Sequence, residues 1–140
     1  MTFTATAEIG INASVERVWQ ALTDPDIVEK YFFGTRVKTD WKPGSSITWS
    51  GEYDGKAYED KGSVIDVQEP HLLRITHFSP MTGLPDKPEN YHTLTYELRS
   101  TNSGTSVKLS QDNNSSQEEA SRAEANWNSM LSGLKRTVEG

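Results

Sequence analysis

The sequence predicts an α+β domain in which a curved antiparallel β-sheet wraps around a long C-terminal α-helix, with two short helices after the first strand. Three observations predict this fold class. The first segment alternates between apolar and polar residues, the middle of the chain repeats this alternation between turn signals, and the last segment carries apolar residues at helical spacing. Helices gathered on one face of an antiparallel sheet define the α+β class.

The first strand and the two short helices are predicted near the N-terminus. Residues 3–11 alternate strictly, which is typical of a strand with one buried face. Ser14 is a preferred N-cap type, and the helix that it opens should end near Thr23. Asp24 and Pro25 then open a second short helix, because proline fits the first helical position, where no backbone N–H is needed.

The middle of the chain is typical of an antiparallel meander. Asp54-Gly55 is a strong signal for a two-residue hairpin. Residues 79–90 hold three prolines and a glycine, and we expect a loop there without secondary structure. About six strands are expected after the short helices. Five of them are assigned to residues 47–53, 58–67, 72–78, 92–98 and 107–109, with turns at 42–44, 69–70 and 103–104 and the end of the sheet at 112–114.

The C-terminal segment predicts the longest helix. Ser116 and Glu119 have the spacing of a capping box, in which each residue satisfies a backbone N–H of the other. One apolar stripe then continues over about 20 residues, a length that can cover a whole sheet. Its members are Ala120, Ala123, Trp127, Met130, Leu131, Leu134 and Val138.

Composition restricts the possible partners. The 140 residues fit a single domain, 1–140, and the net charge of −6 comes without a basic cluster, so nucleic acid is not an expected partner. The sequence has no cysteine, which excludes disulfides, thiolate zinc sites and a cysteine nucleophile.

No apolar run approaches the length of a membrane span, and residues 1–6 lack the features of a signal peptide, so we expect a cytoplasmic location.

The ordered set of segments resembles a known superfamily along nearly the whole chain. The order is similar to the helix-grip fold of the START and birch-pollen-allergen (SRPBCC) superfamily. More narrowly, it resembles the family named for the C-terminal domain of the activator of heat shock protein 90 ATPase. The segments that carry the likeness are NASVERVWQALTDP at 12–25, YFFG at 31–34, TDWKPGSSITWSGEYDGK at 39–56, YEDKGSVIDVQEP at 58–70, YHTLTYEL at 91–98 and NWNSMLSGLK at 126–135.

The resemblance implies a cavity between the sheet and the long helix. Relatives in the wider superfamily bind lipids, sterols, polyketides or plant hormones there. Aromatic rings that carry one polar atom suit such a partly wet pocket. We expect the ligand-binding side chains to be Trp49, Tyr53, Tyr58, Phe78, Tyr96, Trp127, Met130, Leu131 and Leu134, and the alternative is a solid core made of the same residues.

The mouth of such a pocket is expected at Tyr31, Phe32 and Phe33 together with the loop 79–90. The alternative for these three rings is that they seat the second short helix on the sheet. The two roles are compatible.

Histidines offer the only candidates for acid–base chemistry. His77 and His92 fall on consecutive predicted strands, and either could act with Glu52 or Asp60. The alternative is that these charged strand residues form a solvated face. We therefore assign no catalytic residue, and we expect no metal and no cofactor, because no His, Asp and Glu spacing supplies three or four convergent ligands.

Three functions stay open at this point. The first is a non-catalytic binder of a small hydrophobic or amphipathic molecule. The second is an enzyme of the polyketide cyclase or hydrolase type that uses the same cavity. The third is a protein-interaction module, either linked to a chaperone, as the family name implies, or self-associating.

Overall fold

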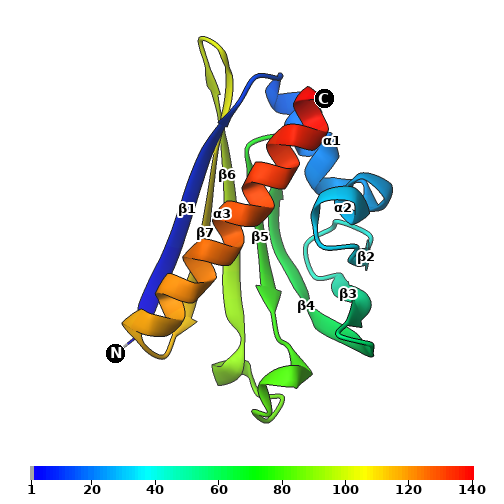
Figure 1. The fold of residues 1–140 in the computed structure, drawn as a ribbon, viewed down its shortest axis with the longest axis vertical. Helices are drawn as coiled ribbons and strands as arrows, with labels where there is room; N and C mark the ends of the chain where they lie inside the picture. Colours follow the sequence, from blue (N-terminus) through cyan, green and yellow to red (C-terminus); the bar gives the residue numbers. More distant parts are fainter. Residues whose placement is uncertain (1) are drawn as a thin grey trace.

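The computed structural model describes residues 2–140, and for Tyr53 it describes the backbone alone. These residues form one sheet and three helices, with two 3₁₀ turns in addition, and Figure 1 shows their arrangement. The elements are β1 (Phe3–Ile11), α1 (Val15–Thr23), α2 (Pro25–Tyr31), β2 (Arg36–Thr39), β3 (Ser46–Tyr53), β4 (Lys56–Gln68), β5 (Leu72–His77), η1 (Pro80–Thr82), η2 (Pro88–Asn90), β6 (His92–Thr101), β7 (Gly104–Asn114) and α3 (Gln117–Glu139).

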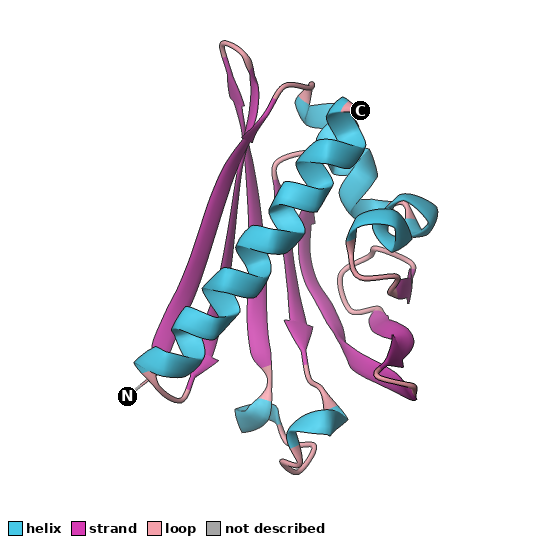
Figure 2. Cartoon of the chain, viewed as in Figure 1, coloured by secondary structure: helices cyan, strands magenta, loops and turns pink. Residues whose placement is uncertain are grey.

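All seven strands belong to one antiparallel sheet in the order β1-β7-β6-β5-β4-β3-β2. The strands β2 to β7 follow one another as a meander, and β1 joins at the β7 edge. Register shifts interrupt β1 near Phe3 and β4 near Val64, and such bulges bend a strand. The sheet therefore curves, and α3 crosses its inner face diagonally, while α1 and α2 lie beside the C-terminal end of α3 (Figure 2). The predicted fold class is confirmed.

Local capping explains where the helices begin. The hydroxyl of Ser14 accepts from the backbone N–H of Arg17, and the carboxylate of Asp24 accepts from the N–H of Asp26 over 2.9 Å. Ser116 caps α3 in the same way. The reciprocal bond of the expected capping box reaches one residue further back, because the Glu119 carboxylate accepts from the N–H of Ser115 instead of Ser116.

The edge strand β1 is covered by side chains of α3. The backbone N–H groups of Thr6 and Asn12 donate to the carboxylates of Glu124 and Glu139, over 3.1 and 2.8 Å. An edge strand otherwise presents unpaired N–H groups to solvent, where another chain can pair with them. These bonds fix α3 along the length of β1.

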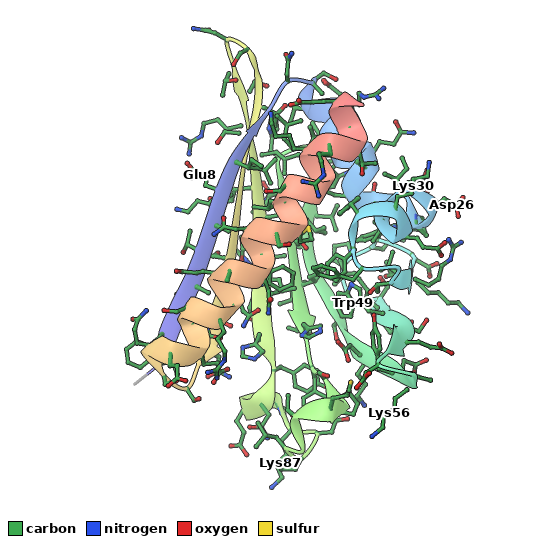
Figure 3. All side chains as sticks on the ribbon, in the orientation of Figure 1. Glu8, Asp26, Lys30, Trp49, Lys56 and Lys87 are labelled. Atoms are coloured by element: carbon green, nitrogen blue, oxygen red, sulfur yellow. The ribbon has the colours of Figure 1, made fainter. Side chains whose placement is uncertain are left out.

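The hydrophobic core lies between the sheet and the helices. Leu131 and Leu134 of α3 are fully buried, as are Val18 of α1 and Ile47 of β3. Charged side chains such as Glu8, Lys30 and Lys87 project from the outside of the ribbon (Figure 3). The described part of the chain contains no helix that is long and apolar enough to cross a bilayer.

Two local predictions were incomplete. The short strand β2 was not assigned, because its four residues alternate over too short a span to stand out. The prediction that residues 79–90 lack secondary structure was wrong, since they contain η1 and η2. Each of these turns has proline in its first position, where the fixed φ of the ring favours a helical turn.

Candidate functional site

A cavity of about 690 Å³ lies between the N-terminal half of α3 and the inner face of the sheet. This volume is typical of small-molecule sites. We call it the main cavity. Its wall is formed by Phe32, Phe33, Thr35, Trp49, Tyr58, Asp60, His77, Ser79, Met81, Leu94, Tyr96, Gln111, Glu119, Arg122, Ala123, Asn126 and Trp127.

Four of the predicted ligand-binding residues lie together on this wall. Trp49 extends from the inner side of β3 (Figure 3), Tyr58 from β4, Tyr96 from β6 and Trp127 from α3. Trp127 is half-buried and also meets the ring of Phe32 edge to face, with 5.9 Å between ring centroids. Aromatic rings from the sheet, from α3 and from the segment after α2 thus line the cavity.

Other predicted residues lie away from the wall. Met130, Leu131 and Leu134 are at most 1 % exposed and belong to the core, on the turns of α3 that follow Trp127. Phe78 is buried and stacks on the ring of Tyr91 at 5.1 Å. The prediction for Tyr53 falls on a side chain outside the described part of the chain.

The three rings predicted at the mouth divide between two roles. Phe32 and Phe33 line the main cavity, and Phe33 is 65 % exposed at its rim. Tyr31 is buried instead, and its hydroxyl donates to the carbonyl oxygen of Ala21 over 2.8 Å. Burial raises the pKa of Tyr31 well above its ordinary value. Tyr31 therefore connects the two short helices.

A histidine–aspartate pair forms a polar part of the wall. His77, the last residue of β5, places Nε2 2.9 Å from Oδ2 of Asp60 on the neighbouring strand β4. The indole of Trp49 packs edge to face on the imidazole, with 4.9 Å between centroids. Both members of the pair are mostly buried, with 22 % and 16 % of the side chain exposed. The second carboxylate oxygen of Asp60 is buried and has no hydrogen-bond partner among the described residues.

A second polar pair lies on the same wall. The hydroxyls of Thr35 and Tyr58 share a hydrogen bond of 2.5 Å. Tyr58 lies across Gly51, where a Cβ atom would come within 2.9 Å of the Tyr58 hydroxyl. Glycine at this position on β3 thus leaves room for the ring. Tyr96 is buried nearby, and desolvation raises the pKa of its phenol, which stays neutral.

The α3 side of the main cavity carries the remaining polar groups. The indole N–H of Trp127 donates to Oε1 of Gln111 on β7 over 2.9 Å. Glu119 accepts from the Ser115 hydroxyl and backbone N–H, and these bonds lower the pKa of its carboxyl group. Arg122 lines the cavity but also donates to Glu118 over 2.8 Å.

A smaller hollow of about 540 Å³ continues from the main cavity toward the 79–90 loop. His77, Ser79, Gln111 and Glu119 line both spaces. In this loop Met81 is 57 % exposed and also lines the main cavity. Two residues of this loop, Ser79 and Met81, thus lie on the wall of the main cavity.

The alternation of side chains along β4 and β5 could have predicted that Asp60 and His77 lie on the cavity wall. Asp60 stands two residues after Tyr58 on β4, and His77 stands two residues after the buried Ile75 on β5. Because side chains repeat every second residue, both had to face inward. Asp60 and His77 were predicted as acid–base candidates, but not as residues of the cavity wall. Gln111 stands two residues after the buried Leu109 on β7, so the same alternation applied to it, whereas Thr35, Glu119 and Arg122 carried no comparable signal.

Metal binding has no support from side-chain clusters in residues 2–140. No three histidine, aspartate or glutamate side chains among them lie close enough to hold an ion together. The cavity in the described chain therefore offers hydrogen bonds, aromatic surface and one acid–base pair.

The model of one protein family matches this chain. The family is described as Activator of Hsp90 ATPase homolog 1-like protein, and the match covers residues 12–139. No curated protein matches the chain.

Solved structures share the fold over nearly the whole chain. A solution structure of a protein from Cytophaga hutchinsonii is 50 % identical, with a TM-score of 0.86 and coverage of 98 % of this chain and 94 % of that one. The Aha1 dimer from Colwellia psychrerythraea is 20 % identical, with a TM-score of 0.75 and coverage of 98 % and 96 %. DynU16, from the dynemicin biosynthetic locus, is 20 % identical, with a TM-score of 0.80 and coverage of 97 % and 47 %.

Proposed function

Because the chain belongs to the family of Activator of Hsp90 ATPase homolog 1-like proteins, we propose that it binds a small hydrophobic or amphipathic molecule in the main cavity. The observation that carries the proposal is a cavity of about 690 Å³ with Trp49, Tyr58, Tyr96 and Trp127 on its wall. Aromatic side chains supply large apolar contact area together with a few polar atoms that orient a ligand.

The shape of the wall favours flat, ring-containing ligands over flexible chains. Rings from three strands and from α3 surround the space, and stacked or edge-to-face contacts are most favourable between planar groups. A flexible chain would also lose more conformational freedom on binding than a rigid ring system.

The test compares two alanine-to-tryptophan variants on neighbouring positions of α3. Ala123 lines the main cavity, whereas Ala125 is exposed on the outside of the helix. The neutral fluorescent probe N-phenylnaphthylamine should bind the unchanged protein and Ala125→Trp, and should lose its site in Ala123→Trp. Equal binding to both variants would place the probe elsewhere on the protein and contradict the proposal.

A thermal-shift screen then identifies the ligand class. Planar aromatic compounds, sterols and lipids are compared on the unchanged protein and on Ala123→Trp. A ligand present at 100 times its Kd adds about 2.7 kcal/mol of stability. Stabilisation that persists in Ala123→Trp would not come from the main cavity.

An enzyme acting on a molecule in the same cavity is the second candidate function. The observation that favours it is the His77–Asp60 pair, because a histidine oriented by a carboxylate is a common general base. A polyketide cyclase or hydrolase would need such a group beside its substrate. Turnover of a cavity-bound compound that is lost in His77→Gln would favour this candidate over simple binding.

Partner proteins are a further part of the proposal. Aha1 from Colwellia psychrerythraea is a dimer, and the family name refers to the Hsp90 ATPase. We favour self-association over a chaperone contact, because Phe33 and Met81 expose apolar surface on the wall of the main cavity. Light scattering over a range of concentrations tests self-association, and a pull-down with the chaperone tests the other partner.

A further inference from the structure

We propose that His77 is a proton acceptor for a ligand hydroxyl, and that the ligand is a ring-containing molecule with an acidic hydroxyl of the phenol or enol type. The inference rests on the proposed function, since it concerns the same main cavity. It assigns to His77 a direct contact with the ligand and to Asp60 a positioning role through His77.

The hydrogen bond to Asp60 determines which nitrogen can accept a proton. An ionised carboxylate can only accept hydrogen bonds, so Nε2 of His77 carries hydrogen and donates to Oδ2 over 2.9 Å. In the neutral imidazole the other nitrogen, Nδ1, is then an acceptor. Nδ1 has no hydrogen-bond partner among the described residues, and the His77 side chain lines both the main cavity and the hollow beside it.

The surroundings hold this tautomer and this ring orientation. Trp49 packs edge to face against the imidazole at 4.9 Å, which limits rotation of the ring. The second oxygen of Asp60 is buried and lacks a partner within the described chain, so His77 is the hydrogen-bond partner that holds this carboxylate. A buried carboxylate orients a histidine in the same way at other sites where the imidazole accepts a proton.

The charges around His77 favour a neutral hydroxyl over a ligand that is already anionic. Asp60 on β4 and Glu119 on α3 both line the main cavity. Arg122 also lines the cavity but is paired with Glu118, and His92, the cross-strand neighbour of His77, places Nε2 3.9 Å from Oε1 of Glu119. A carboxylate ligand would meet two like charges and would bring no proton to Nδ1, whereas a hydroxyl can donate its proton to Nδ1, so that its oxyanion forms beside an imidazolium.

The proposed step is a single proton transfer. The O–H bond of the ligand breaks, its electron pair stays on the oxygen, and the proton forms a bond to Nδ1. The products are an oxyanion and an imidazolium whose Nε2–H still donates to Asp60. No other reactant is consumed.

The experiment uses para-nitrophenol and its methyl ether, para-nitroanisole, as probes. The two differ by the donating hydrogen, and the phenolate form has its own absorption band. At a mildly acidic pH, at which the free phenol is mostly neutral, the unchanged protein should bind the phenol at least about tenfold more tightly than the ether, the equivalent of about 1.4 kcal/mol. The bound phenol should also show the phenolate band.

Three variants separate the contact from general effects on the fold. His77→Gln should bind both probes equally and lack the phenolate band. Asp60→Asn should do the same, because an amide can donate to Nε2 and thereby turn Nδ1 into a donor. His71→Gln is the matched control. His71 immediately precedes β5, its Nδ1 lies 3.1 Å from the Leu98 carbonyl oxygen, and the variant should keep the preference and the band.

The outcomes are distinguishable. If neither the nitro probes nor N-phenylnaphthylamine bind the unchanged protein, the proposed function fails together with this inference. If probes bind but the phenol has no advantage over the ether, or shows no phenolate band, only the inference is overturned. The inference is equally overturned if His77→Gln retains both signals in a protein whose thermal unfolding is unchanged.

Discussion

The indole N–H of Trp127 on α3 donates to the side-chain oxygen of Gln111 on β7 over 2.9 Å. Gln111 in turn donates to Oδ1 of Asn114, which is fully buried and donates to the carbonyl oxygen of Phe3. The long helix, the last strand and the first strand are thus joined by one chain of hydrogen bonds. This chain borders the main cavity at Trp127 and Gln111.

We expect Gln111→Leu to lower the free energy of unfolding by about 1–3 kcal/mol, because the change leaves the Trp127 donor and Asn114 Oδ1 without partners. Urea unfolding measures this loss. Trp127→Phe removes the same bond from the other side. The double variant should lower the free energy of unfolding by less than the sum of the two single changes. Strict additivity would show that the two side chains do not interact in solution.

Leu134→Ala on α3 should lower the free energy of unfolding far more than a truncation of an exposed leucine. Leu134 is fully buried in the core, and truncation of such a leucine typically costs about 2–5 kcal/mol. Leu84→Ala is the control, since that side chain is 53 % exposed. Similar unfolding midpoints for the two variants would mean that the helix presents a different face to the sheet.

Substitution by alanine should lower the stability at one glycine position and leave it unchanged or raise it at another. A Cβ atom at Gly62 on β4 would lie 1.8 Å from the carbonyl oxygen of Thr76 on β5, so Gly62→Ala must displace backbone and should cost at least about 1–3 kcal/mol. At Gly10 on β1 nothing lies within 4 Å of the same atom. Gly10→Ala should therefore be neutral or stabilise by about 0.5–1 kcal/mol. Thermal unfolding of both variants checks the difference.

The pKa of Glu119 predicts part of the acid sensitivity. The Ser115 hydroxyl, above all, and the Ser115 N–H hold this pKa below the ordinary value. A carboxyl whose pKa is lower in the folded state stabilises the fold above its unfolded pKa, and the contribution disappears as the pH falls through the folded pKa. The stability advantage of the unchanged protein over Glu119→Gln should therefore be present at neutral pH and vanish in acid.

Urea unfolding at a series of pH values measures this difference, and an NMR titration of the Glu119 carboxyl carbon measures the pKa itself. Ser115→Ala should move that pKa back toward its ordinary value. Glu118→Gln is the neighbouring control, since its side chain is 81 % exposed and its replacement should change stability by no more than about 0.5 kcal/mol. A difference between the unchanged protein and Glu119→Gln that persists in acid would contradict the prediction.

The sequence by itself determined the fold class and the elements other than β2, η1 and η2. Local patterns predicted these elements, because side-chain periodicity and local hydrogen bonding depend on residues that are near in sequence. Examples are the strict alternation in residues 3–11, the caps at Ser14 and Asp24, and the apolar stripe of α3. The family resemblance added the curved sheet around the helix, and the family match agrees with it.

Only the tertiary structure decided which inward-facing residues border the cavity and which fill the core. Trp127 and Leu134 share one stripe of α3, yet the first reaches the cavity and the second is fully buried. The reason is that α3 crosses the sheet diagonally and its C-terminal end lies beside α1 and α2, whose buried side chains belong to the same core as Leu134 (Figure 1). The pairing of β4 with β5 likewise brings His77 to Asp60 across 17 residues of sequence, a proximity that periodicity alone does not specify.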